Sequence, residues 1–148
     1  MKTKLNLLAA GMLLAAANAG FGQSTVQFTA GAYTVPEWAG TVTLTVQRTN
    51  ETNTAVSVDY ATADGTATNG FKYAATNGNL AFGAGETNQT FVVPILNNGF
   101  VEGTKTFTVT LSSPTNAVLG GDAKTTVNVL DIDVGLQFQF SSYNAANG

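Results

Sequence analysis

The alternation of apolar residues with threonine constrains the fold of this chain more than any other feature of its sequence. In "TVTLTV" (41–46) and "TFTVTL" (106–111) every second residue is Val, Leu or Phe, and the residues between them are Thr. A period of two places the apolar side chains on one face of a β-strand, and Thr favours the extended backbone. We therefore expect strands with one buried face and one face of threonine in solvent.

Shorter segments of the same character follow along the chain, separated by clusters of Gly, Asn and Asp that favour turns. These segments cover 56–61, 80–82, 91–95 and 125–130. About seven strands at this spacing predict an all-β fold, an immunoglobulin-like antiparallel β-sandwich.

The N-terminal residues have the composition of a bacterial secretory signal peptide. Lys2 and Lys4 precede an apolar run from 5 to 17, and "ANA" (17–19) provides the small residues that signal peptidase requires. A membrane-spanning helix needs roughly 20 apolar residues, so we expect no transmembrane span. We predict that residues 1–19 are removed and that the protein is exported to the cell surface, the periplasm or the extracellular space.

The composition excludes several classes of function. Six Lys and Arg residues face nine Asp and Glu residues, and the signal peptide would remove two of the six cations, so nucleic acid is not an expected partner. The chain has no His and no Cys, which excludes catalytic triads, zinc sites and disulfides of the usual kind. We therefore predict no enzyme activity. A glycosidase that uses a carboxylate pair such as Glu37 and Glu102 is a less favoured alternative.

The end of the chain repeats a pattern found at the start of the predicted domain. The sequence "VQF" at 26–28 returns as "LQF" at 136–138, and a Tyr follows each after the same interval. We interpret residues 20–134 as one domain. Residues 135–148 are then either the first strand of a second repeat or an extra edge strand.

Four segments, taken together and in this order, resemble the Calx-β domain. They are "VDYATADGTATNGFKY" (58–73), "LAFGAGET" (80–87), "VEGTKTFTVTLSSPTNAVLG" (101–120) and "VNVLDID" (127–133). The family is known from sodium–calcium exchangers, integrin β4 and large bacterial surface proteins. The resemblance implies a seven-stranded sandwich that binds Ca²⁺ at one end.

The resemblance also implies which residues would hold the ion. The chain keeps four of the family's acids: Glu37, Glu102, Asp131 and Asp133. Asn97 and Asn98 stand where the family has an acidic pair, and Lys72 stands where it has an Asp before the Tyr of the central loop. The implied calcium site is therefore degenerate.

Lys72 leaves three interpretations of these acids open. An ammonium about 4 Å from a divalent ion would repel it by roughly 8 kcal/mol at an effective dielectric near 20, so we expect that lysine and ion do not share the centre. In the first interpretation Lys72 replaces the ion and pairs with the acids. In the second, Lys72 extends into water, and the acids with Asn97 and Asn98 form a weak calcium site. In the third, the acids are merely solvated.

These interpretations define the functions that we expect. The first is a non-catalytic structural or adhesion-type module of an exported or surface protein, joined to tandem repeats or other domains of a longer chain, with a protein or glycan ligand that the sequence does not name. The alternative is a calcium-binding domain of weak affinity. Trp38, the only Trp, is expected to cover the core.

Overall fold

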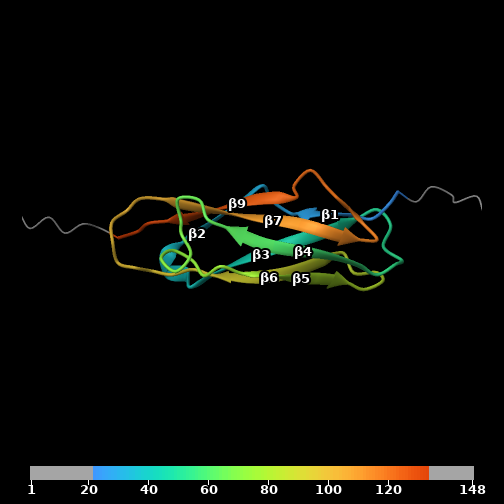
Figure 1. Cartoon of the computed structure of the whole chain (residues 1–148), viewed down its shortest axis with the longest axis horizontal. Coiled ribbons are helices and arrows are strands. Elements are labelled where there is room, and N and C mark those ends of the chain that lie inside the picture. Colours follow the sequence, from blue (N-terminus) through green and yellow to red (C-terminus); the bar gives the residue numbers. More distant parts are fainter. Residues whose placement is uncertain (1–21, 134–148) are drawn as a thin grey trace, which may run out of the picture.

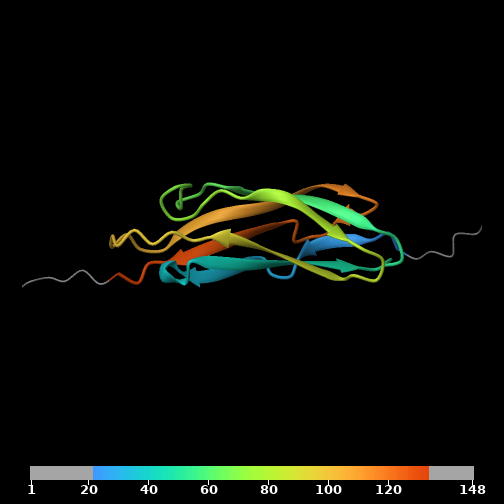
Figure 2. The same cartoon turned by 90° about the horizontal axis from the view of Figure 1, so that it is seen from below.

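A computed structural model describes residues 22–133, and they form two β-sheets packed face to face (Figures 1 and 2). The predicted all-β sandwich is confirmed. The signal peptide (1–19) and the segment 135–148 lie outside the described residues. Within the described part of the chain, no helix is long and apolar enough to cross a membrane.

The first sheet has four strands in the order β6-β3-β1-β8. Their bounds are Asn88–Pro94, Thr41–Thr49, Thr25–Phe28 and Val118–Leu119, respectively. In β3 the alternation acts as predicted, because Val42, Leu44 and Val46 are buried while Thr41 and Thr43 are exposed.

The second sheet has five strands in the order β2-β9-β7-β4-β5. Their bounds are Ala32–Pro36, Lys124–Leu130, Lys105–Thr115, Val56–Ala63 and Asn77–Phe82, respectively. A short 3₁₀ helix, η1 (Glu37–Ala39), follows β2 and ends at Gly40, whose φ of 74° lies in the left-handed region that favours glycine.

Two features of this architecture differ from the sequence prediction. The described residues form nine strands rather than about seven, because the first predicted strand divides into β1 and β2, one in each sheet, and because β8 adds a two-residue strand. The sandwich is also not wholly antiparallel, since β2 pairs with β9 and β1 pairs with β8 in parallel. Parallel pairing requires a long connection between the strands, so local sequence patterns cannot reveal it.

The core lies between the inner faces of the two sheets and contains two stacked aromatic pairs. The rings of Tyr60 and Phe91 join the two sheets with centroids 3.8 Å apart. The rings of Tyr73 and Phe107 are 4.1 Å apart and nearly parallel. The second pair anchors the loop before β5 on the core, and this loop carries Lys72.

A buried arginine ties together the end of the sandwich where the described chain begins. Arg48, on β3, is only 2% exposed. Its guanidinium donates hydrogen bonds to Ser24 Oγ (3.0 Å) and to the carbonyl oxygens of Glu51 (3.1 Å), Thr54 (2.6 Å) and Gly83 (3.3 Å). One side chain therefore satisfies backbone carbonyls of two different loops.

Replacing Arg48 should destabilise the fold more than replacing an exposed cation. We expect Arg48→Met to lower the free energy of unfolding by at least about 3 kcal/mol, because several buried carbonyl groups lose their donor at once. Lys124→Met, at an exposed position of β9, should change it by less than about 0.5 kcal/mol. Urea unfolding of both variants measures the difference, and equal midpoints would contradict this role of Arg48.

Candidate cation site at one end of the sandwich

Four segments that are distant in sequence meet at the end of the sandwich where the described chain finishes. They are η1, the loop between β4 and β5, the loop between β6 and β7, and residues 131–133 after β9 (Figures 1 and 2). Each carries at least one of the residues that the sequence analysis assigned to the calcium site. The fold thus brings the predicted site residues to one end.

Glu37 is the most deeply buried of the acids, with no exposed surface. It is the first residue of η1, directly after Pro36 at the end of β2. The turn at Gly40 directs the chain into β3, so η1 lies across the end of the sandwich. A carboxylate in such a position requires a positive partner.

The backbone on both sides of Lys72 is fixed by the fold. Its neighbour Tyr73 is 1% exposed, stacks on Phe107 and donates a hydrogen bond of 2.5 Å from its hydroxyl to Asp64 Oδ1. Burial and the negative charge of Asp64 raise the pKa of Tyr73 to about 12, so this donor keeps its proton. The Lys72 carbonyl also accepts a hydrogen bond from Leu96 N–H. Lys72 therefore extends from a rigid loop.

The ammonium of Lys72 lies among oxygen atoms of the predicted site. Its Nζ is 2.6 Å from Glu37 Oε2, 3.0 Å from Glu102 Oε2 and 3.0 Å from Asn98 Oδ1. The lysine is 3% exposed. Three N–H donors thus face three acceptors, which satisfies the ammonium fully.

The charges at the site support one another. Burial alone would lower the pKa of Lys72, but hydrogen bonds and charges from Glu37 and Glu102 outweigh it and raise the pKa above its usual value. The hydrogen bond from Lys72, with a second from Asn98, in turn lowers the pKa of Glu102. The lysine is therefore a stable cation at neutral pH.

Asp131 joins the loop between β6 and β7 to the end of β9. Its Oδ2 accepts hydrogen bonds from the backbone N–H groups of Glu102 and Gly103, and its Oδ1 accepts one of 2.9 Å from Asp133 N–H. These donors lower the pKa of Asp131. The carboxylate thus has a structural role whether or not an ion is bound.

A second group of oxygens faces away from the lysine. Glu37 Oε1 and Asp133 Oδ2 are buried and have no hydrogen-bond partner within the described part of the chain. Glu37, Asp131 and Asp133 each offer a carboxylate oxygen, and these three atoms lie within 4.8 Å of one another. Buried unpartnered carboxylate oxygens at this spacing fit a hard cation such as Ca²⁺.

The two asparagines of the predicted site have different surroundings. Asn98 is half-buried, accepts from Lys72 and donates a hydrogen bond of 3.2 Å to Glu102 Oε2. Asn97 is exposed, and its side-chain oxygen accepts from Gly99 N–H within its own turn. Asn98 therefore belongs to the lysine cluster, whereas the bond of Asn97 is local to its loop.

Sequence reasoning misjudged Trp38 and did not find the anchor of the Lys72 loop. Trp38 is 64% exposed at the end of the sandwich, so the expectation that it covers the core was wrong. The bond between Tyr73 and Asp64 was not foreseen, since residues nine apart in an irregular loop have no spacing rule that would reveal it.

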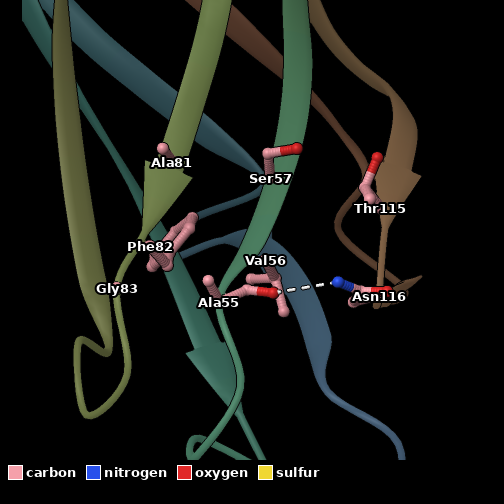
Figure 3. A pocket seen from close by; sticks show the side chains of 8 residues that line it. All are labelled: Ala55, Val56, Ser57, Ala81, Phe82, Gly83, Thr115 and Asn116. Carbon is pink, nitrogen blue, oxygen red and sulfur yellow. Dashed lines mark hydrogen bonds between the residues drawn. The ribbon is translucent and has the colours of Figure 1, made fainter.

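A shallow apolar hollow of about 360 Å³ lies at the opposite end of the molecule (Figure 3). Ends of β4, β5 and β7 line it, and Asn116 donates a hydrogen bond of 3.2 Å to the Ala55 carbonyl at its rim. Its lining residues are Ala55, Val56, Ser57, Ala81, Phe82, Gly83, Thr115 and Asn116. None of these side chains is an acid or base at neutral pH, so the hollow offers no acid–base chemistry.

The geometry agrees with the comparison with known proteins. The family model of the Calx-beta domain matches residues 22–133. This chain belongs to the Calx-β family. The match extends over the whole described part of the chain and includes every residue of the candidate site.

Individual relatives with this domain are sodium/calcium exchangers. The exchanger Calx of Drosophila melanogaster is 33% identical over 115 residues, which are 77% of this chain and 12% of the exchanger. Sodium/calcium exchanger 1 of Bos taurus is 33% identical over 129 residues, 74% of this chain and 13% of the exchanger. This chain thus spans about an eighth of these relatives.

Solved structures give the same result. The apo-form Calx CBD1 domain superposes with a TM-score of 0.73 at 32% identity, covering 76% of this chain and 100% of that domain. The calcium binding domain CBD12 of CALX1.1 gives a TM-score of 0.71 at 32% identity, covering 73% of this chain and 44% of that structure. The Calx-β module of this protein is therefore homologous to exchanger domains that carry the name calcium-binding.

The lowered pKa values of Glu102 and Asp131 predict a loss of stability in acid. A carboxyl group whose pKa is lower in the folded than in the unfolded chain adds stability above its unfolded pKa, and this is lost as the pH falls through the folded pKa. The ordinary values here are 4.5 and 3.8, so the melting temperature should fall below about pH 4.5. Thermal melts between pH 7 and pH 2.5 measure this.

A matched pair of variants separates Asp131 from general acid effects. Asp131→Asn should melt lower than the wild type at pH 7 and should lose less further stability in acid, because its charge no longer titrates. Asp122→Asn, at an exposed position outside the cluster, should follow the wild-type curve. Parallel curves for Asp131→Asn and the wild type would refute the role of its backbone hydrogen bonds.

Proposed function

We propose that this protein is a non-catalytic Calx-β module of an exported or cell-surface protein, in which the side chain of Lys72 replaces a bound cation. One observation carries the proposal: the Lys72 ammonium is 3% exposed and lies within 3.0 Å of oxygens from Glu37, Glu102 and Asn98. A solvated lysine would be mostly exposed. The position is that of a ligated ion.

The charge balance explains what the lysine contributes. Glu37 is wholly buried, and a buried carboxylate without a counter-charge is strongly destabilising. Lys72 provides that charge from within the chain. It also crosses between η1 and the loop that leads into β7, since Glu37 and Glu102 belong to these segments. The end of the sandwich is thus closed by a salt-bridge network.

The burial of the site argues against the glycosidase alternative. The two carboxylates that would have to act on a substrate, Glu37 and Glu102, both bind the same ammonium. Glu37 has no exposed surface, so a glycan could not reach it. The more accessible hollow, at the other end, has no carboxylate in its lining.

A weak calcium site beside the lysine is the second candidate function. Lys72 contacts only Oε2 of Glu37, and the other oxygen of that carboxylate faces Asp131 and Asp133 without a partner. These three residues would hold the ion, and bound Ca²⁺ would supply the positive charge that their oxygens lack. Three carboxylates are few for a cation that takes six to eight oxygens, and the ammonium is near. The expected affinity is about millimolar.

The arrangement of the ends suits a module in a longer chain. The first described residues and the last lie at opposite ends of the sandwich (Figures 1 and 2), so consecutive domains could be joined end to end. Exchanger relatives are much longer than this chain. A structural or adhesion role within tandem repeats fits these features, the predicted signal peptide and the acidic surface.

Removing the ammonium tests the lysine directly. We expect Lys72→Met to lower the free energy of unfolding by about 3–5 kcal/mol at pH 7, because the buried charge of Glu37 loses its partner. The double variant Lys72→Met with Glu37→Leu should recover a large part of this loss, since it removes both charges. Denaturant unfolding of the wild type, both single variants and the double variant gives the coupling free energy. A coupling near zero would disprove the pairing.

Restoring acids tests the relation between lysine and calcium. We expect the melting temperature of the wild type to change little below about 1 mM Ca²⁺, whereas Lys72→Asp with Asn98→Asp should rise by several degrees as the ion binds. The matched control is Lys124→Asp, which adds an acid on an exposed strand position. A clear rise for the wild type at submillimolar Ca²⁺ would show that the ion does not compete with Lys72.

A further inference from the structure

Exposed apolar side chains are concentrated around the cation site. Among residues 22–133, nine large hydrophobic side chains are exposed, and six of them lie on the four segments that form the site. We call these six the apolar rim: Trp38, Phe71, Phe100, Val101, Leu130 and Ile132. Phe71 is 69% exposed and Phe100 is 65% exposed, so these rings are almost fully in contact with solvent.

The apolar rim surrounds the charged cluster because its members are sequence neighbours of the charged residues. Trp38 follows Glu37, Phe71 precedes Lys72, and Ile132 lies between Asp131 and Asp133. The other rim residues adjoin Glu102 and Asp131 in the same way. A group of exposed apolar side chains around a polar centre is typical of an interaction surface.

The chain itself supplies a partner at this place. The last described residue, Asp133, directly follows Ile132 of the apolar rim, and the described chain ends at this end of the sandwich (Figure 1). The residues that come next therefore start within the apolar rim.

The sequence after Asp133 has the composition that such a surface would select. Val134, Leu136, Phe138 and Phe140 alternate with Gly135, Gln137 and Gln139, and no Asp, Glu, Lys or Arg occurs in 134–148. The period of two would place four apolar side chains on one face. An uncharged segment also avoids repulsion by the acids of the site.

We propose that the apolar rim is the docking surface for residues 134–140 of this same chain. Seven residues reach at most about 24 Å when extended, whereas packed sheets lie about 10 Å apart, so the segment can cross the end of the sandwich and cover Trp38 and Phe100. The contact would hold whatever follows residue 140 at a fixed orientation to the module. It does not depend on which cation occupies the site.

Trp38 reports on this contact because it is the only tryptophan of the chain. The test compares the full chain with two variants, Phe138→Ser/Phe140→Ser and the matched control Gln137→Ser/Gln139→Ser. The first should increase the quenching of Trp38 fluorescence by acrylamide about twofold and shift the emission to longer wavelength, because the indole becomes uncovered. The control should keep the wild-type values. Melting curves of all three chains verify the fold.

Three outcomes would overturn the proposal. Equal quenching in all three chains would show that residues 138 and 140 do not cover Trp38. Protection of Trp38 that rises with protein concentration would assign the apolar rim to a second copy of the chain. Protection that occurs only with phosphatidylcholine or phosphatidylglycerol vesicles would assign it to a membrane surface.

Discussion

The buried carboxylate of Glu37 is the constraint on which the end of this sandwich depends. An ionised acid with no exposed surface requires a positive charge within hydrogen-bonding distance, and Lys72 supplies it at 2.6 Å. The loop that carries the lysine is held by Tyr73, which stacks on the core. Core packing and charge pairing at this end are therefore parts of one arrangement.

Cations have a structural rather than a solubilising role in this module. The described residues contain four, Arg48, Lys72, Lys105 and Lys124, and the first two are buried. Arg48 holds loop carbonyls at one end, while Lys72 holds carboxylates at the other. With few exposed positive charges left, the surface is dominated by threonine, asparagine and acids.

Period-two alternation in segments such as Thr41–Thr49 was sufficient to predict the sandwich, because burial of one strand face depends on local pattern. The parallel pairing of β2 with β9 was not predictable in this way, since its partners are about 90 residues apart. At the site, family resemblance located Lys72 among the acids. It could not separate Asn98 from Asn97, because the backbone of their turn decides which amide faces the lysine.

The tether of Lys72 to its own backbone has a consequence for the surroundings in which the module can work. A free ion leaves its ligands when it becomes scarce, so a domain closed by calcium opens under chelation or in soft water. An ammonium that belongs to the polypeptide has a local concentration that dilution cannot lower. The closure between Glu37 and Glu102 is thus permanent, inherited with the sequence rather than taken up from the medium.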